Sequence, residues 1–299
     1  MDALGDLLRG VRADGARFDR AVLTDSWELS CPQGAALELF LVVRGTARVT
    51  AAGYEPRTLR AGDATLACTT APFALASADP GAGETELVSG AYELAGSVGR
   101  RLTSALPPLL VVPAEDECLP IVELIAAEIA EDRPGRQYVM DRMLDWLLAC
   151  TLREWFELPE SCPPAWYRAL GDDVVGPALR ALHEEPARPW TVASLAARAQ
   201  VSRAAFARRF ADLVGRPPMA YLTDWRMTLA AELLTEPGAT VASVAARVGY
   251  ADGFGFSDAF KRIRGVTPSG YRASRAAEAE AEVAAAEKVD PDSWLRAAG

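Results

Sequence analysis

The stretch Thr191-Val-Ala-Ser-Leu-Ala-Ala-Arg198 occurs a second time, with one substitution, as Thr240-Val-Ala-Ser-Val-Ala-Ala-Arg247. The residues that follow each copy also match in kind and order. They are Phe206, Phe210, Gly215, Pro218 and Tyr221 after the first copy, and Phe256, Phe260, Gly265, Pro268 and Tyr271 after the second. A repeat of this extent predicts one supersecondary unit that the chain uses twice.

Each copy has the pattern of a helix-turn-helix. In the first copy Thr191 is a favourable N-cap for a short helix, and Gln200-Val201 makes the turn. Ser202 can cap the second helix, whose phenylalanines stand one turn apart on a face that is expected to be buried. Gly215, with the prolines after it, ends that helix.

The second helix of the first copy leaves a face of small and basic side chains outside the buried stripe. Small residues beside arginine let a helix lie deep in a major groove, where arginine can donate two hydrogen bonds to guanine. Two such helices are expected to enter successive major-groove segments, about 34 Å apart. The candidate DNA contacts of the first copy are Ser202, Arg203, Ala204, Ala207 and Arg208, with Arg203 and Arg208 as base readers and the alanines as contacts for thymine methyl groups.

The local charge distinguishes two interpretations of these helices. They are either a DNA-binding module or helices that merely pack together with their charges solvated. Residues Val174–Arg275 contain 14 Lys or Arg and 8 Asp or Glu, although the whole chain has a net charge of −10. A basic module within an acidic protein is typical of a unit that binds the phosphate backbone. The DNA-binding interpretation is therefore preferred.

The runs SRAAFARRFADLVGRPPMAYLTDWRMTLAAELL and VASVAARVGYADGFGFSDAFKRIRGVTPSGYR resemble the double helix-turn-helix domain of AraC-type transcription regulators. The resemblance covers about a third of the chain and includes the closing G-V-T-P-x-x-Y-R. It implies that Pro218–Glu236 is a long helix joining the two units. The apolar residues of that helix recur at helical spacing, which places Leu222, Trp225, Leu229 and Leu233 in the core.

The second copy departs from the family pattern. Its reading helix is predicted to run from Gly253 to Ile263 with Asp252 as N-cap, and Asp258 stands where many members carry a basic or neutral residue. A carboxylate repels phosphate but can accept a hydrogen bond from cytosine N4. We therefore expect the second unit to position the protein more than it specifies sequence. Its candidate contacts are Phe254, Gly255, Asp258, Lys261 and Arg262, the last two as phosphate contacts.

The N-terminal half is punctuated by glycines between short segments that favour β-structure. These segments are Ala21–Leu29, Leu37–Arg44, Ala47–Ala51, Arg57–Leu59, Ala64–Cys68, Phe73–Leu75 and Glu86–Glu93. Such a series predicts a barrel or a sandwich. The order strand, Arg44-Gly45, strand, Leu59-Arg60-Ala61-Gly62-Asp63, strand resembles the cupin-like sensory domain that precedes many AraC-type modules. The predicted fold class is α+β with two domains: a cupin-like β-barrel with appended helices, then an all-α double helix-turn-helix.

A small barrel can enclose one ligand among its inward side chains. Alternation along the strands nominates Trp27, Phe40, Val42, Cys68, Phe73 and Tyr92 as the lining of a pocket for a small-molecule effector. A barrel filled by its own side chains is the alternative.

Catalysis by a cupin metal centre needs imidazole and carboxylate ligands. The chain has one histidine, His183, which lies outside the predicted barrel, and residues such as Leu39, Leu41 and Phe73 stand where such cupins place their histidines. We therefore predict no enzyme activity, no catalytic residue, no metal and no cofactor. A cupin enzyme fused to a DNA-binding module remains a weaker alternative.

Five cysteines, Cys31, Cys68, Cys118, Cys150 and Cys162, form no C-x-x-C pair. In a reducing cytosol the default is a free, buried thiol. A thiol-based regulator that uses Cys31 and Cys68 is the alternative to control by a small molecule.

Helices are predicted at Leu119–Glu131 and Gln137–Glu157, and the second carries too much apolar surface for one face. The resemblance implies that these helices form a homodimer. The predicted domains are residues 1–157 for effector binding and dimerisation, 158–173 as linker, 174–275 for DNA binding and 276–299 as an acidic helical tail. Neither a secretory signal nor a membrane-spanning run is recognisable, so the expected location is the cytoplasm. Expected partners are promoter DNA, an effector and, for an activator, RNA polymerase.

Overall fold

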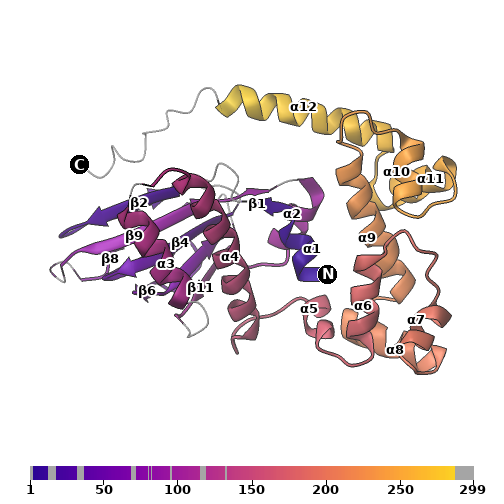
Figure 1. Ribbon diagram of the computed structural model, residues 1–299, viewed down its shortest axis with the longest axis horizontal. Helices are drawn as coiled ribbons and strands as arrows, with labels where there is room; N and C mark the ends of the chain where they lie inside the picture. Colours follow the sequence, from indigo (N-terminus) through magenta and orange to yellow (C-terminus); the bar gives the residue numbers. More distant parts are fainter. Residues whose placement is uncertain are drawn as a thin grey trace. The chain divides into compact units, whose positions relative to one another are not determined.

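The computed structural model describes residues 3–12, 18–31, 37–68, 72–79, 81, 83–94, 96–114, 119–131 and 133–286. The chain divides into two compact units (Figure 1). The sheet unit comprises the described residues of Val11–Ala95 and Leu102–Cys162. The helical unit consists of Met1–Gly10, Gly96–Arg101 and Pro163–Val289, so two short N-terminal segments belong to it together with the repeat.

The sheet unit holds two antiparallel sheets. The five-stranded sheet has the order β11 (Leu109–Val112), β7 (Ala64–Ala67), β4 (Glu38–Arg44), β9 (Thr85–Ala91) and β2 (Phe18–Leu23). The four-stranded sheet has the order β3 (Glu28–Cys31), β8 (Phe73–Ser77), β5 (Thr46–Ala51) and β6 (Arg57–Arg60). A further pair joins β1 (Val11–Arg12) to β10 (Glu93–Leu94).

One apolar core is shared by side chains from both large sheets. Along β5, Ala47 and Val49 are buried while Arg48 between them is exposed, which is the alternation of a strand with one covered face. Phe40 of β4 meets Phe73 of β8 edge to face, with ring centroids 5.6 Å apart. The antiparallel, cupin-like unit is therefore confirmed, with one correction to its strands. The predicted segment Ala21–Leu29 is divided between β2 and β3, because the chain leaves the first sheet after Leu23 and enters the second at Glu28. Strand β11 was not predicted.

Two helices follow the strands in this unit, α3 (Leu119–Ala130) and α4 (Arg136–Glu157). Close packing of α4 on the sheet depends on Gly90 of β9, because a Cβ there would lie 2.9 Å from both terminal methyl groups of Leu144. Tyr92 reinforces the contact: its buried hydroxyl donates to the carbonyl of Leu144 at 2.7 Å. Both helices begin or end within one residue of the predicted bounds.

The helical unit is built around the repeat. Its main elements are α5 (Ala165–Leu170), α6 (Val175–Glu184), α7 (Val192–Arg198), α8 (Arg203–Val214), α9 (Pro218–Leu233), α10 (Val241–Arg247), α11 (Gly253–Arg264) and α12 (Pro268–Ala286). The N-terminal segments contribute α1 (Ala3–Leu8) and the start of α2 (Gly96–Thr103). The two cores of the unit lie on either side of α9, which supplies Tyr221 and Leu222 to one and Met227 and Ala230 to the other. The long joining helix predicted from Pro218 is thus present and ends at Leu233.

The predicted linker, residues 158–173, differs from the structure in its second half. Helix α5 begins at Ala165, and its Ala169 is fully buried in the core formed with α6 and α8. Proline and glycine flank that short helix, and those residues gave the stretch its linker-like composition. The predicted tail helix is the continuation of α12, which starts at Pro268. Residues 287–299 of the predicted tail lie outside the described ranges.

Candidate DNA-binding surface

The first helix of each repeat is held by the same capping box. Thr191 accepts a hydrogen bond from the Ser194 amide at 3.0 Å, and Ser194 Oγ accepts one from the Thr191 amide at 3.0 Å. Thr240 and Ser243 repeat both contacts at the same distances. Each box satisfies two amides that a helix N-terminus otherwise leaves without partners. The predicted caps are confirmed.

The turn between the two helices requires a left-handed residue in both copies. Gln200 has φ 55° and Gly249 has φ 80°, and the residue after each donates to a carbonyl of the preceding helix. Glycine adopts this conformation without strain, whereas glutamine does so at a cost of about 1 kcal/mol. Gly249 has a second reason to lack a side chain, because a Cβ there would lie 2.3 Å from the carbonyl oxygen of Ala187.

Helix α8 exposes the face that the sequence predicted. Ser202 caps it by accepting from the Ala205 amide at 3.2 Å. Arg203, Ala204 and Arg208 are exposed and Ala207 is half-buried, while the phenylalanines of the helix are fully buried. The small side chains leave the helix backbone accessible between two arginines, as close approach to base edges requires.

Most arginines of the module are engaged within the protein and are therefore unsuitable as DNA contacts. Arg226 donates to the carbonyls of Pro186 and Arg188, Arg272 to that of Leu234, and Arg247 pairs with Glu236. Among the described residues, five cations of Val174–Arg275 form no hydrogen bond or ion pair: Arg198, Arg203, Arg208, Lys261 and Arg262. Four of these five are predicted contacts. The fifth, Arg198 at the end of α7, is not among the predicted contacts, because sequence alone does not distinguish it from its equivalent, Arg247.

Arg209 and its neighbour Arg208 on α8 differ in their contacts, because only Arg209 is held by another part of the protein. Its guanidinium forms two hydrogen bonds to Asp172 Oδ2, at 3.0 and 2.7 Å, and a third to Oδ1 at 3.1 Å. Asp172 also accepts from the amides of Val174 and Val175 at the start of α6. These contacts hold the pKa of Asp172 below its usual value, chiefly through the hydrogen bond from Arg209. Arg208, the preceding residue, forms none of these contacts.

Helix α11 brings its five predicted residues to the surface in a different arrangement. Asp252 caps the helix by accepting from the amides of Phe254 and Gly255 at 2.9 and 2.8 Å. Phe254 is 89% exposed, and Asp258 is exposed one turn further on. Lys261 and Arg262 follow at the other end of the helix. The cations of this helix are therefore confined to its C-terminal half.

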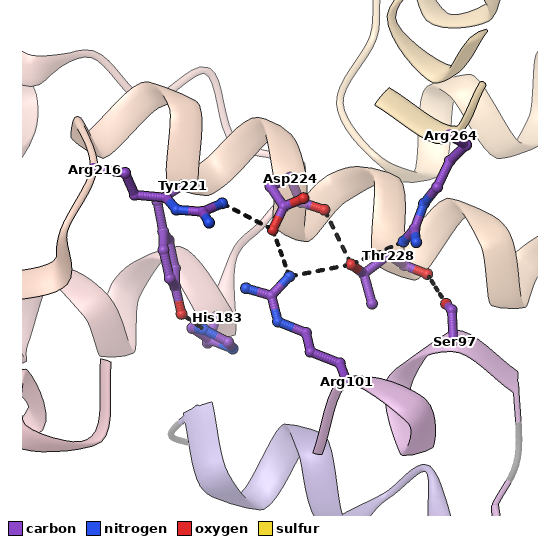
Figure 2. A network of polar contacts seen from close by, with 8 residues as sticks. All are labelled: Ser97, Arg101, His183, Arg216, Tyr221, Asp224, Thr228 and Arg264. Atoms are coloured by element: carbon purple, nitrogen blue, oxygen red, sulfur yellow. Dashed lines mark hydrogen bonds and ion pairs between the residues drawn. The ribbon is translucent and has the colours of Figure 1, made fainter. Parts of the chain in front are cut away.

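Helix α2 is joined to α9 by a polar network (Figure 2). Arg101 donates to Asp224 at 2.6 Å and to Thr228 Oγ1 at 3.3 Å, and Arg216 reaches the same carboxylate oxygen at 3.3 Å. Ser97 Oγ donates to the Thr228 carbonyl at 3.0 Å. These contacts attach α2 to the helix that carries both helix-turn-helix copies.

A carboxylate of α9 also caps α2. Glu232 Oε1 accepts from the amides of Ser97 and Val98, the second at 3.0 Å, and from Ser97 Oγ at 2.9 Å. A negative charge at a helix N-terminus satisfies free amides and interacts favourably with the helix dipole. Sequence reasoning missed this cap because its partners lie far apart in the chain.

His183, at the end of α6, stands before the first copy where Glu232 stands before the second. Its Nδ1 lies 2.8 Å from Asp6 Oδ2 of α1, and its Nε2 lies 2.8 Å from the Tyr221 hydroxyl. The ring is buried and lies 4.5 Å from the Trp225 ring, centroid to centroid. His183 is therefore a packing residue, and both of its ring nitrogens are engaged within the helical unit.

Four of the six predicted ligand-lining residues lie in or against one apolar core rather than around an open space. Phe40, Val42 and Phe73 are buried in the core shared by the two sheets, and Trp27 packs against it. Tyr92 departs from the predicted lining, because its hydroxyl is directed at α4 rather than at the space between the sheets. Strand alternation misassigned Tyr92 because it follows the end of β9, where the alternation no longer applies.

An open cavity of about 490 Å³ lies beside β3, β5 and β8. Of the predicted lining residues, Phe73 borders it; Cys31, which was assigned to the redox alternative, borders it too. The remaining lining residues are Ser30, Thr50, Ala51, Ala52, Tyr54, Pro56, Pro72 and Ala74. The cavity is wide open to solvent, and its lining combines apolar side chains with the hydroxyl groups of Ser30, Thr50 and Tyr54.

The thiols of the redox alternative are poorly suited to oxidation. Burial raises the pKa of both Cys31 and Cys68 to about 12, and Glu38 adds to the effect at Cys31. Because the thiolate is the reactive form, both side chains are unreactive thiols near neutral pH. The redox alternative is not supported. Cys118 lies outside the described residues.

Comparison with known proteins agrees with this architecture. The family described as Cupin matches residues 2–157, and the family described as Helix-turn-helix domain matches residues 195–274. A putative AraC-like transcription regulator of Streptomyces lividans is 32% identical over 298 residues, spanning 91% of this chain and 98% of that protein. The RCS-specific HTH-type transcriptional activator RclR of Escherichia coli is 29% identical over 284 residues, spanning 91% and 97%.

Two solved structures are also similar. The DNA-binding domain of AdpA, a global transcriptional factor in complex with a target DNA, is 32% identical and covers 36% of this chain and 96% of its own, with a TM-score of 0.35. ToxT from Vibrio cholerae is 13% identical and covers 86% and 97%, with a TM-score of 0.36.

A cupin-like unit joined to two tandem helix-turn-helix copies defines a DNA-binding transcription regulator. The chain belongs to the AraC-type family of these regulators. Both the recognised resemblance and the predicted two-domain α+β fold are confirmed.

Proposed function

We propose that the protein binds promoter DNA by placing α8 and α11 in successive major-groove segments, with Arg203 and Arg208 of α8 reading guanines. The observation that carries the proposal is that these two arginines are exposed and form no hydrogen bond or ion pair among the described residues, whereas Arg209 beside them is held by Asp172. Each bidentate arginine–guanine pair contributes about 1–3 kcal/mol of discrimination. Lys261 and Arg262 of α11 supply phosphate contacts.

Selection of bound fragments from genomic DNA, followed by methylation interference at guanine N7, tests this proposal with the full-length chain. We expect methylation of one or two guanines in one half of the site to block binding, and Arg208→Ala to remove that sensitivity. Arg209→Ala removes an adjacent positive charge and is the matched control, so it should keep the interference pattern. An unchanged pattern in both Arg203→Ala and Arg208→Ala would refute base reading by α8.

We propose that a small molecule bound by the sheet unit controls DNA binding, with the cavity beside β3, β5 and β8 as its site. The cavity volume and mixed lining support this choice. Native mass spectrometry of the chain after incubation with a small-molecule extract of its source cells should show an added mass. Ala52→Trp, which fills the cavity, should abolish the adduct, whereas Val22→Trp on the exposed part of β2 should keep it.

The route for this control is α2. Its residues Gly96–Arg101 belong to the helical unit, and Leu102, the next residue, belongs to the sheet unit. A ligand alters DNA binding only if it has different affinities for two conformations of the protein. Movement of the chain at Leu102 would be transmitted to α9 through Arg101 and Glu232. Arg101 is not among the candidate DNA contacts, so Arg101→Ala should change operator affinity indirectly. Amide hydrogen exchange in α2 should be faster in the variant than in the wild type.

We propose a homodimer formed by α3 and α4. These helices expose Leu124, Tyr138 and Trp146, which are 47, 72 and 49% accessible. Tyr138 and Trp146 lie about two turns apart on α4, and Arg142 between them stacks on the Tyr138 ring and pairs with Asp145. Two exposed aromatic rings beside an ion pair are suited to a symmetric contact with a second copy. Sedimentation of the full-length chain should give a dimer, and Trp146→Glu should give a monomer. Val22→Glu, an equally exposed position on β2, is the control.

We infer further that the sheet unit is a sensor rather than an enzyme, that the protein acts in the cytoplasm and that, as an activator, it would contact RNA polymerase. The single histidine of the chain is engaged with Asp6 and Tyr221, so no imidazole is available to a cupin-type metal centre. The close relatives are named as transcription regulators. Among the described residues, no helix has both the length and the apolar character needed to cross a membrane. Transcription in vitro from a selected promoter would distinguish activation from repression.

A further inference from the structure

Phe254 is an exposed aromatic residue at a place where the fold does not need one. Its side chain is 89% accessible, more than any other large hydrophobic side chain of the described residues. An exposed ring forgoes the hydrophobic free energy that burial would provide. The equivalent position in α8 is Ala204, so the helix-turn-helix can be built without an aromatic side chain here.

The surroundings of Phe254 favour close approach to a flat partner. Gly253 and Gly255 flank it, and a Cβ at Gly255 would have no neighbour nearer than the Asp252 carboxylate at 3.7 Å. The backbone in the first turn of α11 is therefore uncovered on both sides of the ring. Asp252 fixes that turn through two amides, so the ring projects from a well-defined helix start.

The chemistry of the α11 face excludes reading of guanine by arginine at this end of the helix. Asp258 is the exposed charged residue one turn after Phe254, and the cations Lys261 and Arg262 lie further along. In the major groove the apolar group on a base edge is the thymine methyl, which phenylalanine can contact. A carboxylate can accept a hydrogen bond from cytosine N4 but repels phosphate.

We propose that Phe254 is a specificity-determining residue of the second helix-turn-helix and that it contacts a thymine methyl group in the half-site bound by α11. Asp258 accepts from the exocyclic amine of a neighbouring cytosine. The first copy thus reads guanine by hydrogen bonds, and the second reads thymine by apolar contact. This inference rests on the proposed function, in which α11 enters the major groove.

Uracil substitution in the selected operator tests the inference directly, because uracil keeps the hydrogen bonds of thymine and lacks its methyl group. In the α11 half-site we expect one thymine whose replacement lowers the affinity of the full-length protein about fourfold, the effect of losing one buried methyl group. Phe254→Ala should lower affinity for the thymine operator by about tenfold, and uracil should then have no further effect. Phe254→Leu should keep part of the uracil effect.

Uracil substitutions in the α8 half-site are the control, and their effects should be the same for the wild type and Phe254→Ala. Because the ring is exposed, the variant is expected to keep the thermal unfolding midpoint of the wild type. The inference is overturned if no thymine in the α11 half-site responds to uracil, or if the response persists in Phe254→Ala. Loss of promoter activation with unchanged DNA affinity would also overturn it, by making the ring a protein contact. Methylation interference at the guanines of the α8 half-site tests the proposed function independently of the role of Phe254.

Discussion

The two helix-turn-helix copies share a backbone design and differ in the charge of their reading helices. Both begin with the same capping box, both turn through a left-handed residue, and both bury two phenylalanines one turn apart. Along the exposed face, Arg208 of α8 corresponds to Asp258 of α11, whereas Asp212 corresponds to Arg262. The order of charge along the helix is thus reversed between the copies.

This difference separates the residues that make the fold from those that select the DNA. Caps, turn residues and buried aromatics repeat because each satisfies a backbone group or fills a core. The exposed positions are free of that requirement, and they diverge. A duplicated fold can therefore carry two different reading surfaces on one chain.

Exchanging the charges at the corresponding positions should have the largest effect. Arg208→Asp is expected to lower operator affinity at least about 100-fold, since it removes a base contact and adds a charge that phosphate repels. Asp258→Arg should instead raise the affinity for non-specific duplexes, increase the salt dependence by about one phosphate contact and remove the preference for cytosine at its position in the operator. Fluorescence anisotropy at several salt concentrations measures both. Equal effects of the two exchanges would contradict the assignment of different roles to α8 and α11.

The second largest difference is expected in the stability effects of substitutions at the two turn residues. Gly249→Ala is expected to lower the free energy of unfolding by more than about 2 kcal/mol, because a left-handed alanine is strained and its Cβ would meet the Ala187 carbonyl. Gln200→Gly should stay within about 1 kcal/mol of the wild type. Gly265→Ala is the control, since that glycine has φ 78° and no atom within 4 Å of a Cβ. Chemical denaturation that shows equal costs for Gly249→Ala and Gly265→Ala would remove the steric argument.

The capping boxes should behave alike, which tests the shared part of the comparison. Thr191→Ala and Thr240→Ala should each lower the free energy of unfolding by about 1 kcal/mol, because each leaves an N-terminal amide without its acceptor. Serine at either position keeps the hydroxyl and should restore most of the loss. Thermal unfolding of the four variants provides the measurement, and a cost at only one threonine would show that the copies contribute unequally to stability.

The smallest difference is expected between the last arginines of α7 and α10. Arg247 pairs with Glu236 on the surface, so Arg247→Ala should change the free energy of unfolding by less than about 1 kcal/mol and leave DNA affinity unaltered. Arg198 forms no contact ion pair among the described residues and interacts with Glu184 only at longer range, so Arg198→Ala should change stability little and reduce the salt dependence of binding by about one contact. The salt dependence of affinity separates the two. The reverse result would assign the phosphate contact to the second copy.

Sequence patterns predicted the repeat well because its signals are local. A threonine cap, a turn and a phenylalanine pair each act within one or two helical turns, and all of them lie where the spacing placed them. The exposed candidates on α8 and α11 followed from the same periodicity. Arg198 and Arg247 could not be separated, since the difference depends on Glu236, a residue of a neighbouring segment.

The predictions lost accuracy where contacts join distant parts of the chain. Nothing local in Asp6 or Ser97 indicates that these residues fold with His183 and Glu232, because the partners are more than a hundred positions away. The lining of the cavity could not be predicted for the same reason, because the residues around it come from different strands that pair across the sheet. Strand alternation named Tyr92 because the sequence did not show that β9 ends at Ala91, and it gave no reason to name Thr50 or Tyr54, which border the cavity.

The attachment of α1 and α2 to the helical unit has a practical consequence for exchanging sensors between regulators. A chimera joined at a single point between the matched families would separate His183 from Asp6 and Glu232 from the start of α2. Two buried or half-buried polar groups would then lose their partners at once. Grafts that carry Met1–Gly10 and Gly96–Arg101 with the recipient's own DNA-binding half would keep those partners, and the foreign portion would be inserted as two separate pieces.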